Sequence, residues 1–122
     1  MVRFLSFLAA VLSVAGAGTA QPLSQSLAGC AGLLEAVQIV VPEHENIARI
    51  EAAVAAFPRA AREEADAEVR DDPEAWVAQS LADTRAQWAR HGGLAVFSED
   101  SVDAVDACRP VAEGRGIDMD FD

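Results

Sequence analysis

The sequence predicts an all-α fold, a small four- to five-helix bundle whose first and last helices are joined by a disulfide. Alanine is abundant, and leucine, glutamate and arginine are frequent, which is typical of helices. The alternation of polar and apolar residues that marks strands is nearly absent. Both cysteines fall on apolar faces of expected helices, which places those two helices side by side.

The first expected helix covers about residues 23–41. Glu35 is its only charge, and a helix that is apolar on most sides is usually surrounded by others. Gly29 and Gly32 would let a neighbouring helix approach closely. Its apolar residues step by four and three positions, namely Leu23, Leu27, Cys30, Leu34, Val37 and Val41.

The second expected helix begins at Pro42, a residue that suits a first helical turn. Glu43 and Glu45 follow at the positive end of the helix dipole. Pro58 is expected to end or kink this helix. Residues 59–70 are helix-prone but highly charged, so we expect a peripheral continuation with one face in water.

The remaining helices have clear start signals. Asp72 can cap a helix that begins at Pro73, and Gly92-Gly93 is expected to end it. A short apolar linker follows, which we expect to be extended. Ser98 can then cap the last helix, whose apolar face contains Cys108.

Residues 1–20 have the pattern of a cleaved secretory signal peptide. Arg3 supplies a short positive region, and the apolar run from Phe4 to Ala17 is too short to span a bilayer comfortably. Small residues fit cleavage after Ala20, with cleavage after Ala17 as the alternative. We therefore expect a bacterial protein that is periplasmic or secreted.

Two cysteines in an exported chain are most simply explained by a disulfide, here Cys30–Cys108. The chain has no Cys-x-x-Cys and no Cys-x-x-Cys-His, which argues against thiol-redox and covalent haem chemistry. The tetrapeptide Leu27-Ala28-Gly29-Cys30 resembles the lipobox of bacterial lipoproteins. In lipoproteins the lipobox follows the apolar run almost directly, whereas here residues 18–26 lie between the two. An outer-membrane lipoprotein acylated at Cys30, with a structural envelope role, is the alternative.

The charge balance argues against nucleic acid as a partner. The chain has nine arginines, no lysine and 20 acidic residues, for a net charge of −11. Phosphate recognition needs clustered cations, which this composition does not provide. An acidic surface either serves the solubility of an exported protein or attracts cationic partners.

No pattern in the sequence indicates catalysis, a cofactor or a metal. His44 and His91 lie on different expected helices, whereas a metal site needs three or four converging ligands. There is no glycine-rich phosphate loop and no nucleophile in a recognisable turn. We expect a non-enzymatic protein, with a hydrolytic or metal-dependent enzyme as the least favoured alternative.

The candidate partner contacts lie in two places. Trp76 has polar neighbours on its expected helix, so it either anchors a partner or packs against residues 59–70. The acidic tail, residues 113–122, is expected to be disordered unless it docks on a partner. Its apolar positions, each followed by an aspartate, are Ile117, Met119 and Phe121.

The sequence therefore predicts a helical domain over residues 21–112 that acts as a binding module. The expected partner is an unknown protein, which the net negative charge would favour as a cationic one, or a small apolar ligand. Membrane contact is expected only if Cys30 is acylated.

Overall fold

The computed structural model describes residues 21–121, so the expected signal peptide at 1–20 lies outside the described residues. Within that range the chain is helical and contains no strand, which confirms the all-α prediction. The elements are α2 (Leu23–Val40), α3 (Ile47–Ala67), α4 (Pro73–Trp88), the 3-10 helix η1 (Arg90–Phe97) and α5 (Glu99–Glu113).

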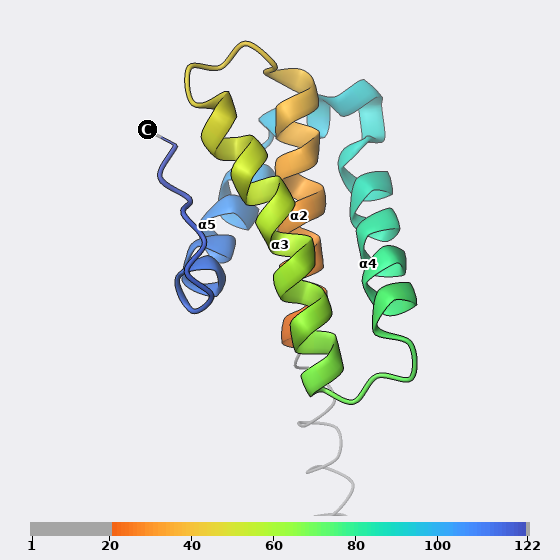
Figure 1. The fold of residues 1–122 in the computed structure, drawn as a ribbon. Helices are drawn as coiled ribbons and strands as arrows, with labels where there is room; N and C mark the ends of the chain where they lie inside the picture. The colour runs from red at the N-terminus through yellow and green to blue at the C-terminus, as the bar shows by residue number, and fades with distance from the viewer. Residues whose placement is uncertain (1–20, 122) are drawn as a thin grey trace, which may run out of the picture.

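Helix α2 is the centre of the bundle. It packs against α3, α4, α5 and η1, and Figure 1 shows it behind α3, with α4 and α5 on either side. By length and composition α2 would also pass for a membrane-spanning helix, a property that core helices share. Here its buried Leu27, Leu33 and Leu34 meet Phe57 of α3 and Val77 of α4 in one core cluster.

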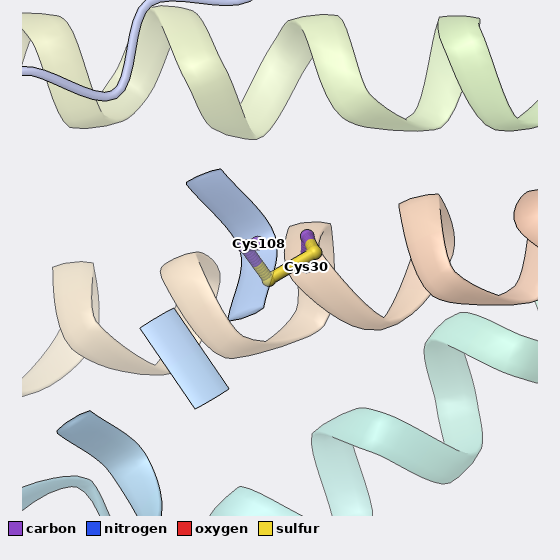
Figure 2. Close-up of a disulfide and its surroundings, with 2 residues drawn as sticks. All are labelled: Cys30 and Cys108. Carbon is purple, nitrogen blue, oxygen red and sulfur yellow. A yellow bond between two sulfur atoms is a disulfide. The ribbon is translucent and has the colours of Figure 1, made fainter. Parts of the chain in front are cut away.

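A disulfide joins α2 to α5, as the sequence predicts. The sulfur atoms of Cys30 and Cys108 are 2.11 Å apart, and the two residues are separated by 78 positions (Figure 2). Both side chains are buried, with exposed fractions of 4% and 6%. The bond therefore ties the last helix to the central one inside the core.

Helix α3 begins at Ile47 and not at Pro42, so the predicted start of the second helix is wrong. The N–H of His44 donates to the carbonyl oxygen of Val41, and the Nδ1 of His44 accepts from the N–H of Asn46. These local hydrogen bonds hold residues 41–46 in a turn, so the helix does not begin until Ile47.

Helix α3 also runs through Pro58 to Ala67, where the sequence led us to expect an end or a kink. Proline removes one backbone hydrogen bond from a helix. Phe57 before it, and Ala60 and Ala61 after it, are all buried in the core. Burial on both sides of Pro58 outweighs the missing bond, so the helix continues.

The two later helices start where their capping signals predict. The side chain of Asp72 accepts from the N–H of Ala75, and that of Ser98 accepts from the N–H of Ser101. The apolar linker between them is helical, as part of η1, and not extended. The Gly92-Gly93 pair lies inside η1 with positive φ angles of 66° and 90°.

The tail differs from the disordered segment expected for residues 113–122. Residues 117–121 have no regular secondary structure, yet the side chain of Met119 is only 5% exposed and belongs to the core cluster. Ile117 and Phe121 are half-buried against the same cluster. Burial of these alternating apolar side chains holds the tail in place. This burial requires the cleft of the folded bundle, which the sequence pattern alone does not show.

Candidate functional site

Trp76 is engaged inside the molecule. Its indole N–H donates to the hydroxyl oxygen of Ser24 over 2.9 Å, and the guanidinium carbon of Arg70 lies 4.1 Å from its ring centroid. Trp76 thus joins the start of α4 to the start of α2 and to the α3–α4 turn. This geometry corresponds to the packing alternative for Trp76, in which it contacts the 59–70 segment.

The carboxylate of Glu68 completes this junction. One oxygen accepts from the hydroxyl of Ser24 at 2.6 Å, and the other accepts from the Ser24 N–H at 3.1 Å. Burial by itself raises the pKa of Glu68, but the hydrogen bonds from Ser24 and the neighbouring Arg70 guanidinium outweigh it and lower the pKa. Ser24 is fully buried, whereas Glu68, Arg70 and Trp76 are half-buried, so the cluster ties the ends of three helices together at the surface of the bundle.

Of the three apolar tail residues, Met119 is buried in the core cluster, and Ile117 and Phe121 are half-buried against it. His44 is exposed and takes part in the turn before α3. Among the residues that the structure describes, no group of three His, Cys, Asp or Glu side chains is placed to hold a metal ion.

An apolar pocket of about 280 Å³ lies where the carboxyl ends of α2 and α4 meet η1. Ile39, Val40 and Trp88 form its walls, and the absence of side chains at the two glycines of η1 leaves it open. The ion pair between Arg85 and Glu35, 2.9 Å long, lies at its edge. Its apolar lining suits a small apolar molecule.

A second hollow, of about 320 Å³, is a groove between α4 and α5, with α2 as its floor. These two flanking helices have at most marginal contact with each other. The disulfide that Figure 2 shows forms part of the floor. Besides the two cysteines, the lining mixes small, apolar and uncharged polar residues, namely Gln21, Ser26, Gly29, Leu33, Thr84, Gln87, Trp88, Ala104, Ala107 and Val111.

The borders of this groove are acidic. On α5, Asp100 and Asp103 lie four residues before the groove-lining Ala104 and Ala107, and therefore on the same side of the helix. On α4, Asp83 lies four residues before the groove-lining Gln87. All three aspartates are exposed. The only cation within α5 is Arg109, which pairs with Asp106.

Comparison of the chain with protein-family models, curated proteins and solved structures finds no match. Sequence reasoning pointed to an acidic surface and to close approach at Gly29, but it did not place them together. The groove arises from the relative placement of α4 and α5, which brings the acidic residues to either side of Gly29.

Proposed function

We propose that this protein is an exported, non-enzymatic binding module whose α4–α5 groove accepts a cationic amphipathic helix from a partner protein. The observation that carries the proposal is the open strip of α2 between two helices that barely touch, bordered by Asp83, Asp100 and Asp103. An apolar groove with one sign of charge at its edges is the usual receptor for an amphipathic helix of the opposite charge.

The lining of the groove suits a helix in particular. The floor and one wall carry the small residues Ser26, Gly29 and Ala107, which let a helix backbone approach closely. Ala104 and Val111, both half-buried, supply apolar surface for the partner's buried residues. The partner's cations would then lie above the aspartates of the two borders, where they gain electrostatic attraction.

Export is part of the same proposal. Its support is the positive, apolar and small-residue pattern of residues 1–20, together with the buried Cys30–Cys108 disulfide, since disulfides persist in oxidising compartments. The test is the intact mass of the protein from its native envelope fraction, with and without reduction. A mass for residues 21–122 less two hydrogens is expected; a mass beginning at an acylated Cys30 would contradict it.

The lipoprotein alternative has less support. Acylation requires a free Cys30 at a new N-terminus, which would remove Leu27 and Ala28, both fully buried, from the core. It would also leave Cys108 without its partner. An enzymatic function draws support from no group of residues described above.

Binding is tested with a synthetic peptide that places leucines and lysines on opposite faces of a helix, labelled with a fluorophore. Its fluorescence anisotropy is titrated with the oxidised protein at two salt concentrations. We expect micromolar binding that weakens as salt rises, because exposed charges are screened. A peptide of the same composition in scrambled order, which has no apolar face, is the control.

Two pairs of variants locate the site. Ala107→Trp fills the groove and should lower the affinity at least tenfold, whereas Ala52→Trp, at an exposed site on α3, should not. The double variant Asp100→Asn/Asp103→Asn should weaken binding and its salt dependence. Its matched control is Glu51→Gln/Asp66→Asn, which makes the same change of charge on the exposed side of α3. Equal affinities within each pair would contradict the proposed groove.

The pocket beside Trp88 supports a second candidate, the binding of a small apolar ligand. A dye that fluoresces in apolar surroundings should report it, with Trp88 as the intrinsic reporter of occupancy. Ala36→Phe would fill this pocket and should abolish the signal, while Ala107→Trp should leave it unchanged. Dye fluorescence that is equal in Ala36→Phe and in the wild-type chain would dismiss this candidate.

A further inference from the structure

The C-terminal segment Ile117–Phe121 lies in a cleft between α3 and α5. These two helices have at most marginal direct contact, and the segment bridges them. In Figure 1 the chain reverses at the end of α5 and runs back alongside that helix, past the first turns of α3. The segment therefore completes this side of the bundle without being a helix or a strand.

Three consecutive carbonyl oxygens of the segment accept hydrogen bonds from side chains of the cleft. Arg109 of α5 donates to Met119, over 2.9 Å. Arg49 of α3 donates to Asp120, also over 2.9 Å, and Asn46 donates to Phe121. Side-chain donors aimed at successive main-chain carbonyls are how a protein holds a bound extended peptide.

The side chains of the segment alternate as in a bound strand. Met119 is buried, and Ile117 and Phe121 are half-buried against the core cluster. Asp118 and Asp120 between them are exposed. The cleft thus selects apolar residues at every second position and leaves the intervening ones in water.

Charge also matches the segment to its cleft. In a chain with more than twice as many acids as arginines, Arg49 and Arg109 both face this acidic segment. A third cation, Arg115, pairs with Glu63 at 2.8 Å and with Glu64 at 3.2 Å, which anchors the start of the segment on α3. An acidic, extended ligand is the one that this cleft attracts.

The connection to α5 is a reversal at glycine. Gly116 has a φ of 68°, and the N–H of Ile117 donates to the carbonyl oxygen of Ala112. Glycine has access to other backbone conformations at little cost, so the direction of the segment can change at this residue. A vacated cleft would expose apolar core, which favours its being filled again.

We propose that the cleft between α3 and α5 is a peptide-binding site, and that it accepts residues 117–121 of a second copy of this chain, giving a tail-exchanged dimer. The second copy offers the one segment whose side chains and carbonyls fit every contact described above. Reciprocal exchange is also closed and symmetric, so it ends at two copies. This proposal is independent of the α4–α5 groove.

The attached segment competes with exchange. A short flexible connection gives an effective concentration on the order of millimolar. We therefore expect the wild-type chain to be monomeric at micromolar concentration and to dimerise as it approaches millimolar. Removing the competition should reveal the exchanged contact at much lower concentration.

Two complementary variants remove the competition from the attached segment. Met119→Asp cannot bury its own segment but keeps an intact cleft. Arg49→Glu/Arg109→Glu keeps an intact segment but has a cleft that repels it. Mixed at about 100 µM, a tenth of the effective concentration above, they should form a heterodimer in native mass spectrometry, at least ten times more abundant than either homodimer.

The control replaces Met119→Asp with Val102→Asp, which introduces the same charge at an exposed site on α5. That mixture should stay monomeric. Circular dichroism establishes that each variant is helical. A monomeric mixture of two folded complementary variants would overturn the proposal.

If Met119→Asp does not fold, a mixing experiment with the wild-type chain tests the exchange. Unlabelled and isotope-labelled copies are mixed near 1 mM, the estimated effective concentration. A mixed dimer that is lost in Arg49→Glu/Arg109→Glu supports the exchange. A chain that stays monomeric, or a dimer that persists in that variant, overturns it.

Discussion

Ser24 and Glu68, 44 positions apart, form a cap at the first turn of the central helix. Both oxygens of the carboxylate accept from the serine, one from its hydroxyl and one from its N–H. The first turn of α2 contains no acidic residue of its own. A side chain from the end of α3 therefore supplies the negative charge that the start of α2 favours.

Replacing this carboxylate should destabilise the protein in a pH-dependent way. At pH 7 we expect Glu68→Gln to lose about 1–3 kcal/mol, because Ser24 keeps a buried donor with a poorer acceptor. The folded pKa of Glu68 is lowered, so its contribution is complete above the ordinary value of 4.5 and is lost as the pH falls through the folded pKa. Thermal unfolding from pH 7 to pH 3 measures the difference.

The control for this pH series is Glu51→Gln, an exposed carboxylate on α3. Its melting temperature should follow that of the wild-type chain throughout. If the gap between wild-type and Glu68→Gln stays constant down to pH 3, Glu68 does not carry the linkage.

The contact between Gly32 and Thr84 sets the approach of α2 to α4. A Cβ at Gly32 would lie 2.8 Å from both the Cβ and the Cγ2 of Thr84. Gly32→Ala should therefore cost about 1–3 kcal/mol of overpacking. At Gly29 the nearest atom would be 3.7 Å away, so Gly29→Ala should stabilise the helix by up to about 1 kcal/mol. Urea unfolding of both variants checks the opposite signs, and a Gly32→Ala chain that is more stable than wild type would refute the close approach.

The disulfide should contribute a large share of the stability. In the chain-entropy account, a link across 78 positions is worth about 4–5 kcal/mol. The double variant Cys30→Ala/Cys108→Ala should lose about this amount in urea unfolding. The reduced wild-type chain is the comparison, since it lacks the link but keeps both side chains. Equal stability of the reduced and oxidised chains would show that the link does not constrain the unfolded state.

Trp76 should act through Ser24. Trp76→Phe keeps a ring beside Arg70 but loses the hydrogen bond to the serine hydroxyl, at a cost of about 1 kcal/mol. A double-mutant cycle with Ser24→Ala measures the coupling, which should be non-additive because the residues are in contact. If the losses in free energy of unfolding are additive, Trp76 does not act through Ser24.

Val69 should be a site of stabilisation. It has a φ of 60° in the α3–α4 turn, a conformation that costs a β-branched residue about 1–2 kcal/mol. Its side chain is 85% exposed, so Val69→Gly gives up little burial and should raise the melting temperature. Val102→Gly, within α5 at an exposed site, should lower it by removing helix propensity. A lower melting temperature for Val69→Gly would show that this turn is not strained.

Local signals were enough for the features that depend on a few neighbouring residues. The caps at Asp72 and Ser98 mark the starts of α4 and α5, because each side chain satisfies a backbone N–H three residues ahead. The Cys30–Cys108 pairing also followed from pattern, because each cysteine sits on an apolar stripe that had to be buried.

Packing between distant segments decided the rest. Pro58 is tolerated because Phe57 and Ala61 are buried on either side of it, and the tail is held because Arg49 and Arg109 lie across a cleft that no local pattern contains. The α4–α5 groove exists because two helices flank α2 without meeting. Composition and spacing specify the helices and their buried faces, whereas which surfaces stay open depends on how whole helices pack, and that is a property of the complete fold.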